Sequence, residues 1–298
     1  MTAPSAPLGT VLTAMATAFH ADGSLDLEGT QKVAKHLVAH GHDGLVVSGT
    51  TGESATTTLE EDGQILAAVR EAVGPGIKLV AGVGTNDTRT SVKLAQQARA
   101  NGADAALLVT PYYNKPGQRG ILHHFRTVAD AAELPVMVYD VPGRTGSALT
   151  LDSYRTLADW PEVVAVKAAT GDVVQGGRLV EMGFSVYSGD DSLNLAFLAM
   201  GACGFVSVAG HVYGDDLRAL YDTFHAGQPG QALEIWTRML PAIDAIMGVE
   251  NYGATTAKAA LELLGVLDNR HVREPLVALD DDEVAALRTG LVAAGLLT

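Results

Sequence analysis

Eight short apolar runs, seven of them followed by a segment with helical periodicity, are the feature of this sequence that most constrains its fold. Runs of this kind, rich in Val, Leu and Ala, are typical of strands buried on both faces of a parallel sheet. They lie at residues 9–19, 44–48, 78–82, 105–109, 135–139, 163–167, 185–188 and 204–208. Helical segments follow them at 25–40, 59–73, 88–101, 118–132, 151–158, 173–182 and 215–226. This alternation predicts a (β/α)8 barrel, the TIM-barrel fold.

The pattern changes after residue 226. Residues 227–230 read Gly-Gln-Pro-Gly, and the remainder is helical only, at 231–246, 252–264 and 281–294. We therefore expect a flexible N-terminal tail at 1–8, a catalytic barrel at 9–227 and an all-helical C-terminal domain at 228–298. A purely helical extension must bury its apolar stripes, so it should pack on the barrel or on a neighbouring subunit.

Charge and cysteine content argue against several classes of partner. The net charge of −14 disfavours nucleic acid and anionic membranes, because both are bound through basic surfaces. The sequence shows no signal-peptide pattern and no run of roughly 18 apolar residues that would span a membrane. Cys203 is the single cysteine, so neither an intrachain disulfide nor a thiolate metal cluster can form. The histidines lack a coherent ligand set, and we predict a cytoplasmic protein without a metal.

Lys167 ends the sixth apolar run, Val-Val-Ala-Val-Lys. Strand alternation would place its side chain on the face shared by Val163 and Ala165, which in a barrel can be the interior. A buried lysine amine loses its proton easily, so it becomes a nucleophile toward carbonyl groups and can form a Schiff base. The alternative for a single lysine is a side chain that extends from the strand end into solvent.

Other polar side chains follow neighbouring runs, where barrel enzymes build their active sites. Thr50 and Thr51 lie between two glycines and are suited to holding a carboxylate or phosphate, although they equally fit a helix cap. Tyr112, Tyr113 and Tyr139 follow or end the fourth and fifth runs. Each tyrosine, taken alone, fits an aromatic ring that packs a loop or the core.

Arg144 lies in the Pro-Gly loop after the fifth run. It is either a solvated charge or a fork that binds a substrate carboxylate. Together with Lys167, these groups supply an amine, a carboxylate cradle, proton-carrying phenols and an anion clamp. Their convergence from four strand ends predicts a site for iminium chemistry.

Five motifs, in order and spacing, resemble the dihydrodipicolinate synthase (4-hydroxy-tetrahydrodipicolinate synthase) family of the N-acetylneuraminate-lyase-like class I pyruvate aldolases. They are Gly-Thr-Thr-Gly-Glu-Ser-Ala-Thr at 49–56, Thr-Pro-Tyr-Tyr-Asn-Lys-Pro at 110–116, Tyr-Asp-Val-Pro-Gly-Arg-Thr-Gly at 139–146, Val-Lys at 166–167 and Ser-Gly-Asp-Asp at 188–191. The resemblance spans roughly residues 9–265 and is far more specific than any single motif. It implies a lyase that condenses pyruvate with L-aspartate 4-semialdehyde to 4-hydroxy-tetrahydrodipicolinate, the first committed step toward diaminopimelate and lysine, without a cofactor.

The resemblance also implies roles for individual residues. Lys167 would form an imine with pyruvate, and Thr51 with its neighbouring amides would bind the pyruvate carboxylate. Tyr139 would relay protons through Thr50 to Tyr113. In this family the second tyrosine reaches into the active site of an adjacent subunit.

Three further positions concern the second substrate and the pocket wall. Arg144 would hold the carboxylate of aspartate 4-semialdehyde, and Gly189 and Val206 would line the pocket. The Pro-Gly-Arg-Thr-Gly form favours a synthase over a sialic acid lyase. The family usually forms a tetramer of two tight dimers, so the resemblance implies a homotetramer.

Three alternatives stay open from the sequence. The first is another aldolase or lyase of the superfamily, acting on N-acetylneuraminate or a 2-keto-3-deoxy sugar acid. The second is a non-catalytic ligand-binding paralogue, which a lost lysine or tyrosine would mark, and neither is lost here. The third is a purely structural oligomer, which leaves the carboxylate cradle and Arg144 unexplained.

Two features depart from the family pattern. Ala168 follows the lysine where many relatives carry an acid, which alters the local field but leaves imine chemistry intact. Leu59, Asp62 and Thr90 replace the histidines and glutamate with which lysine-inhibited members bind lysine between subunits. The retained positions are Ser54, Asn86 and Tyr112. The resemblance therefore implies weak or absent inhibition by lysine, and inhibition at sub-millimolar lysine would contradict it.

Overall fold

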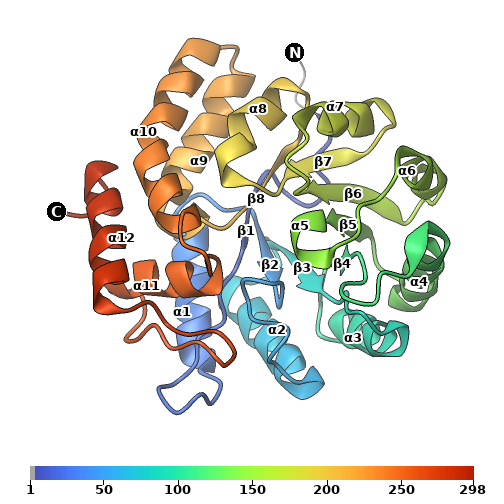
Figure 1. The fold of residues 1–298 in the computed structure, drawn as a ribbon, viewed down its shortest axis with the longest axis horizontal. Coiled ribbons are helices and arrows are strands. Elements are labelled where there is room, and N and C mark those ends of the chain that lie inside the picture. Colours follow the sequence, from blue (N-terminus) through green and yellow to red (C-terminus); the bar gives the residue numbers. More distant parts are fainter. Residues whose placement is uncertain (1–3) are drawn as a thin grey trace.

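The computed structural model describes residues 4–298, and its centre is a closed barrel of parallel strands. The strands are β1 (Val11–Ala14), β2 (Gly44–Val47), β3 (Lys78–Gly82), β4 (Ala105–Val109), β5 (Val136–Asp140), β6 (Val163–Ala168), β7 (Ser185–Ser188) and β8 (Gly204–Ser207). Neighbours pair in chain order, and β8 pairs with β1 to close the sheet. The predicted (β/α)8 barrel is confirmed, with helices around the strands in Figure 1.

The helices that follow the strands cover the outside of the barrel, apart from the short helix at the strand ends that carries Arg144. They are α1 (Leu27–Ala39), α2 (Leu59–Val73), α3 (Thr88–Ala100), α4 (Gly117–Ala132), α5 (Pro142–Thr145), α6 (Leu151–Ala158), α7 (Val173–Glu181), α8 (Asn194–Ala199) and α9 (Gly210–His225). Several begin at an aspartate that caps the first turn: the side chains of Asp26, Asp87 and Asp172 each accept a backbone N–H three residues on. These caps fix where the chain turns from strand to helix.

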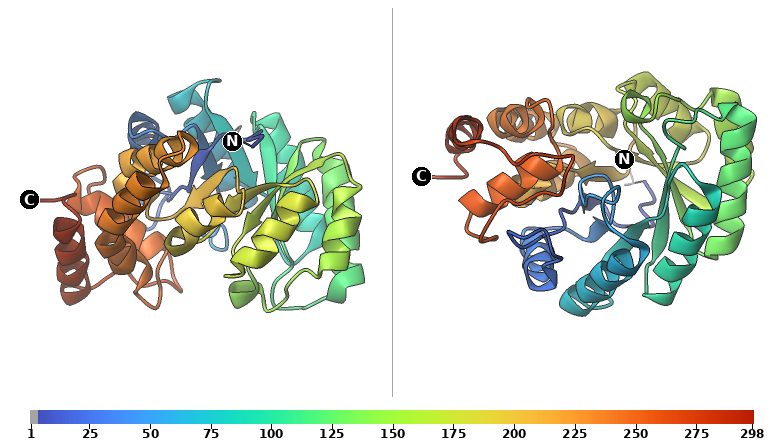
Figure 2. Two further views of the ribbon diagram at one scale, coloured as in Figure 1. Left: turned by 90° about the horizontal axis from the view of Figure 1, so that it is seen from above. Right: turned by 60° about the horizontal axis from the view of Figure 1, so that its bottom comes forward.

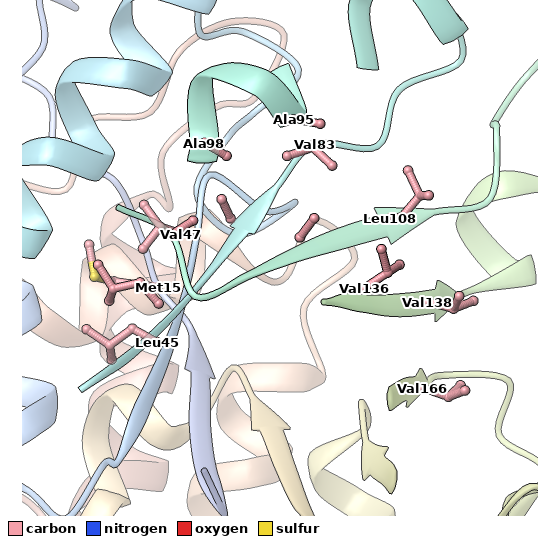
Figure 3. Packing of buried hydrophobic residues seen from close by; sticks show 14 of the residues in the cluster. Met15, Leu45, Val47, Val83, Ala95, Ala98, Leu108, Val136, Val138 and Val166 are labelled. Carbon is pink, nitrogen blue, oxygen red and sulfur yellow. The ribbon is translucent and has the colours of Figure 1, made fainter. Parts of the chain in front are cut away.

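Alternate residues of each strand build two apolar layers. In β5, Val136 and Val138 pack outward against the helices, whereas Met137 and Tyr139 pack in the barrel interior. Figure 3 shows part of the outer layer, including Val138. The interior is therefore a packed core, and the space for a ligand lies above it, at the strand ends.

Strand β6 departs from simple alternation. Val136 of β5 pairs with Val163, but the next residue, Met137, pairs with Ala165, so the register shifts by one residue. Val163 consequently packs in the outer layer, while Ala165 packs inside and Lys167 lines the central pocket. The expectation that Val163 shares a face with Lys167 was wrong, because this irregularity reverses the alternation between them.

The C-terminal extension consists of α10 (Pro229–Met247), α11 (Ala254–Leu263) and α12 (Asp281–Ala293). These helices pack with α9 around a separate apolar cluster that also contains Val11 and Phe205 of the barrel. In the views of Figures 1 and 2 they lie together on one side of the barrel. The extension thus packs on the barrel, one of the two placements expected, and the division at residue 228 remains a proposal.

Several elements differ from the sequence expectation. The first run is a strand only at Val11–Ala14, because the chain then leaves the sheet and Phe19 forms an isolated bridge with Leu25. The short helices α5 and α8 and the 3-10 turn at Asp191–Leu193 were not predicted, since they are too short for helical periodicity to show. Helix α9 begins earlier than expected, across a kink at Tyr213.

The N-terminal tail that the sequence predicts at 1–8 lies partly outside the described residues, since 1–3 are not described. Leu8 is buried with the interior layer, and its backbone N–H donates to the Tyr187 hydroxyl over 3.3 Å. This end of the described chain therefore packs against the barrel core. Within residues 4–298, none of the helices combines the length and the apolarity that crossing a bilayer requires.

Candidate active site

A cavity of about 140 Å³, here called the central pocket, lies at the C-terminal ends of the strands. Six of the eight predicted site residues line it: Thr50, Thr51, Tyr139, Arg144, Lys167 and Gly189. They come from the ends of β2, β5, β6 and β7 and the loops that follow. The barrel thus assembles residues that are far apart in sequence.

Lys167 is 5% exposed and points into this pocket from β6. Burial lowers the pKa of its amine to about 8, and the nearby Arg144 guanidinium acts in the same direction, whereas the Asp191 carboxylate opposes the shift. The Lys167 Nζ lies 4.3 Å from the centre of the Tyr139 ring. The neutral, nucleophilic form is therefore far more accessible than in a solvated lysine.

Asp191 provides the buried negative charge behind the lysine. Its carboxylate accepts the backbone N–H of Val208 over 2.8 Å and that of Ala209 over 2.9 Å. It also accepts hydrogen bonds from the Ser207 hydroxyl and the Asn194 amide. The carboxylate is thereby held in place between β7 and β8, close enough to stabilise a cation at the lysine.

Tyr139 neighbours Lys167 across the β5–β6 pairing, where the two residues are directly opposite. Burial raises the pKa of its phenol to about 12, while the neighbouring Arg144 guanidinium and Thr50 hydroxyl act in the opposite direction. The phenol therefore stays protonated at neutral pH and can donate a proton within the pocket.

The opposite wall is the turn at 49–54, which follows β2. Thr51 is buried within it, and Thr50 is exposed at its surface. A Cβ on Gly52 would lie only 3.1 Å from the Met15 carbonyl oxygen, so the close approach of this turn to the barrel favours glycine. The turn presents two hydroxyls and several backbone amides toward a ligand anion.

Arg144 lies at the mouth of the central pocket, and Gly189 lies at its floor beside Lys167. Arg144 is exposed on the short helix α5, with its Cζ 5.1 Å from the centre of the Tyr252 ring. A Cβ on Gly189 would stand 3.1 Å from Cε of Lys167, so glycine leaves the lysine side chain room to move. The arrangement combines a buried amine, a protonated phenol and an exposed guanidinium around one small cavity.

A family model described as the dihydrodipicolinate synthetase family matches residues 7–294. The chain belongs to this family. A 4-hydroxy-tetrahydrodipicolinate synthase from Kineococcus radiotolerans is 49% identical over 294 residues, covering 98% of this chain and 95% of that protein. The resemblance found from the motifs is thus confirmed.

Solved structures of family members are similar throughout. Dihydrodipicolinate synthase from Cyanidioschyzon merolae, solved with lysine bound, is 38% identical with a TM-score of 0.93, and 97% of this chain matches 99% of that one. The chloride-inhibited enzyme from Acinetobacter baumannii, complexed with pyruvate, is 34% identical with a TM-score of 0.92, and 97% of this chain matches 100% of that one.

Two predicted site residues lie away from the central pocket. Tyr113 is 88% exposed and has a positive φ of 69°. It lines a second cavity of about 650 Å³ that also involves Thr50 and Arg144. Val206 is fully buried in the barrel interior, and Val208 lines the central pocket instead. In this single chain, Tyr113 therefore faces outward beside its own site.

The positions that the resemblance connects with lysine inhibition lie partly in this second cavity. Ser54, Asp62 and Tyr112 line it. Burial raises the pKa of the Asp62 carboxyl. Leu59 is exposed at the first turn of α2. The expectation of weak inhibition by lysine stays a prediction.

The sequence reasoning missed the wall that the C-terminal extension contributes. Met247, Asn251, Tyr252, Gly253 and Leu276 line the central pocket opposite the barrel strands. The only local signal is the break between two helical segments at 248–253. This break indicates a loop, but it does not indicate that the loop lines the pocket. The same reasoning quoted Asp191 in a family motif without giving it a role.

No group of three or more His, Cys, Asp and Glu side chains that could hold a metal ion occurs in the part of the chain from residue 4 onward. The central pocket is lined by an amine, phenols, hydroxyls and a guanidinium, which bind carbonyl and carboxylate groups, and also by the Asp190 carboxylate and the Asn251 amide. The expectation of a reaction without a cofactor remains a prediction.

Proposed function

We propose that this protein is a 4-hydroxy-tetrahydrodipicolinate synthase, a lyase that condenses pyruvate with L-aspartate 4-semialdehyde. The observation that carries the proposal is the buried Lys167 amine, with a pKa lowered to about 8, inside a pocket that also holds Tyr139, Thr51 and Arg144. The name carried by the relative at 49% identity supports the same reaction. The activity belongs to the first committed step toward diaminopimelate and lysine.

In the first half-reaction, the neutral Lys167 amine attacks the keto carbon of pyruvate. Loss of water then gives the imine, and loss of a methyl proton gives the enamine. Thr51 and the amides of its turn hold the pyruvate carboxylate, and Asp191 stabilises the iminium charge near the lysine. The solved pyruvate complex of the Acinetobacter baumannii relative supports pyruvate as the first substrate.

Protons move through Tyr139, the phenol next to the lysine. Thr50, which lines the same pocket, would pass the proton toward the pocket mouth. The third member of the relay, Tyr113, faces outward in its own chain, so we propose that it serves the site of a second copy. This arrangement requires at least a dimer, and a homotetramer built from two such dimers stays our proposal for the assembly.

In the second half-reaction, Arg144 at the mouth binds the carboxylate of aspartate 4-semialdehyde as a charge-assisted pair. The enamine carbon attacks the aldehyde carbon, and the aldehyde oxygen takes up a proton. The amine of the product then attacks the imine carbon, which closes the ring and releases Lys167 as the free amine. The product is a heterocyclic dicarboxylate, and no metal or organic cofactor takes part.

Intact mass after borohydride treatment with pyruvate tests the imine directly, because borohydride reduces and traps the C=N bond. We expect one pyruvate adduct per chain in the wild type and none in Lys167→Ala. A folded wild-type protein without an adduct would overturn the proposed mechanism and favour a non-catalytic paralogue.

A coupled assay then identifies the second substrate. We expect turnover of aspartate 4-semialdehyde with pyruvate, and no cleavage of N-acetylneuraminate or of 2-keto-3-deoxy sugar acids. The opposite preference, in a protein that forms the pyruvate imine, would make it another aldolase of the superfamily. A cytoplasmic location also stays a prediction.

A further inference from the structure

A buried ion pair joins the barrel turn of the central pocket to the C-terminal extension. Glu53 belongs to the turn at 49–54, and Lys258 lies in α11. Their side chains form a salt bridge and are each only 1% exposed. The reaction mechanism proposed above uses neither residue. A buried pair of this kind is costly to form, so its position beside the pocket calls for a physical reason.

The pair is completed by three neighbours from two parts of the chain. The Lys258 amine also donates to the His271 carbonyl over 2.8 Å, and the backbone N–H of Arg273 donates to Glu53 over 2.8 Å. Lys258 Nζ and Arg273 Cζ each lie 4.2 Å from the ring centre of Phe19. Both charges are thereby hydrogen-bonded, which is the condition under which a buried pair rigidifies its surroundings.

Glu53 also holds the turn through its own backbone. Its φ is +59°, a left-handed conformation that glutamate adopts rarely, and Ser48, which directly precedes the turn, has a φ of +52°. In this conformation the Glu53 N–H donates to the Thr50 carbonyl over 3.1 Å. Strained backbone of this kind persists only when surrounding contacts over-determine it, and the Lys258 and Arg273 contacts do so here.

Lys258 connects Glu53 to the other wall of the pocket. It lies one turn of α11 beyond Ala254, which lines the central pocket with Asn251 and Tyr252. The pair therefore links the turn at 49–54 of the barrel with the segment at 251–254 across the pocket. Movement of either wall would have to break a buried ion pair.

We infer that Glu53 and Lys258 are positioning residues: their buried ion pair sets the conformation of the turn that presents Thr50 and Thr51, and so controls the binding of pyruvate. The inference rests on the proposed function, because it assigns the carboxylate of pyruvate to this turn. It gives the C-terminal extension a part in substrate binding that reaches beyond its packing on the barrel.

The test separates positioning from stability through the double variant Glu53→Gln/Lys258→Met. This change removes both charges while nearly preserving side-chain volume, and a buried pair replaced in this way leaves no uncompensated charge. We expect a melting temperature close to that of the wild type. We also expect kcat/KM for pyruvate to fall about tenfold or more, because a displaced turn binds the carboxylate poorly.

The second substrate provides an internal readout. Because Lys167 carries a covalent intermediate between two half-reactions, kcat/KM for the aldehyde reports only the second one. We expect it to fall less than kcat/KM for pyruvate, since Arg144 lies on α5 and not in the turn that holds the pyruvate carboxylate. A double variant with an intact melting temperature and an unchanged kcat/KM for pyruvate would show that the pair is only structural and would overturn the inference.

Two further variants complete the design. Glu53→Asp keeps the charge but withdraws the carboxylate by one methylene. It therefore tests the geometry of the pair even if the double variant folds poorly. We expect the same selective loss of kcat/KM for pyruvate. Glu262→Gln is the matched control: it breaks a pair with Arg270 that also ties α11 to the following segment, at 2.8 Å. We expect wild-type kinetics from it, and a selective loss for pyruvate there would contradict the assignment to Glu53.

Failure of this inference is distinguishable from failure of the proposed function. The wild-type imine adduct at Lys167 tests the function alone. The comparison among the variants tests the positioning role, and the yield of trapped imine at limiting pyruvate should fall in the same order as kcat/KM for pyruvate. If the wild type forms the adduct, and Glu53→Asp and the double variant give the same yield as the wild type, the positioning inference is overturned and the proposed function stands.

Discussion

Two buried aspartates near the pocket differ in how their charge is compensated. Asp191 accepts two backbone N–H groups and two side-chain donors. Asp140, at the end of β5, accepts only from the Tyr154 hydroxyl at 2.9 Å and the Leu149 N–H at 3.2 Å. Its Oδ1 has no partner in the described chain, and burial raises the pKa of this carboxyl to about 6. The charged form of Asp140 is thus disfavoured in the folded protein.

This shift predicts a pH-dependent effect of Asp140→Asn on stability. A folded pKa of about 6 lies above the ordinary 3.8, so the folded state binds the proton more tightly, and wild-type stability falls as pH rises between these values. Asparagine carries no charge and keeps an acceptor for Tyr154. We expect Asp140→Asn to be more stable than the wild type at about pH 8. The difference in free energy of unfolding between variant and wild type should be larger at about pH 8 than at about pH 4 by on the order of 2 kcal/mol.

Urea unfolding of both proteins at the two pH values measures this difference. Asp104→Asn is the control, because hydrogen bonds from Leu79 and Arg70 lower the pKa of Asp104 despite its partial burial. Its stability change should be nearly the same at both pH values, because a carboxyl whose pKa is lowered from 3.8 stays ionised in the folded protein at pH 4 and above. A pH-independent change in Asp140→Asn would show that the carboxyl is not shifted in the folded protein.

The start of α2 shows how a single element is fixed locally and then used at long range. The Thr58 hydroxyl accepts the Glu61 N–H over 3.2 Å, and the Glu61 carboxylate accepts the Thr58 N–H over 2.9 Å, which is a capping box. The same carboxylate binds the Arg273 guanidinium through both oxygens, at 2.8 and 2.6 Å. The first turn of α2 therefore also anchors the segment that carries the pocket wall.

Loss of the cap should destabilise this element without affecting the chemistry. We expect Thr58→Ala to lower the free energy of unfolding by about 1 kcal/mol, because the exposed threonine contributes its cap and little packing. Thr58→Ser keeps the hydroxyl and should retain most of the stability. Urea unfolding at one fixed protein concentration compares the three proteins. Equal stability of the alanine and serine variants would argue against a contribution from the cap.

At the scale of the whole molecule, the outward position of Tyr113 leaves the proposed proton relay incomplete within one chain. The second cavity, which Tyr113 lines, adjoins the central pocket through Thr50 and Arg144, since both residues line both cavities. A symmetric dimer would place the tyrosine of each chain at the site of the other. The proposed proton relay then depends on assembly.

Mixed subunits test this dependence. Lys167→Ala lacks the amine and Tyr113→Phe lacks the phenol, so we expect each variant alone to have little activity. If the tyrosine acts across the interface, a mixed dimer has one intact site. Co-expression of equal amounts should therefore restore about a quarter of the wild-type activity for random pairing. Doubly tagged, purified mixed oligomers without activity above that of the parents would exclude the shared site, and full activity of Tyr113→Phe alone would exclude the relay.

The sequence by itself determined the order of the βα units and the place of the chemistry. Apolar runs and helical periodicity are local properties, and the ends of parallel strands must meet at one face of a closed barrel. For this reason the sequence alone assigns Lys167, Tyr139, Thr51 and Arg144 to one pocket, and all four line the central pocket of the structure.

Tertiary structure alone decided what depends on residues distant in the chain. The register shift in β6 arises from its pairing with β5, so the alternation of Val163 and Lys167 could not be read from one strand. Glu53 and Lys258 are 205 residues apart, and neither shows a local sign of the other. The pocket wall from the C-terminal extension and the outward direction of Tyr113 follow from packing. Long-range contacts of this kind are set by barrel closure and helix docking, which leave no periodicity in the sequence.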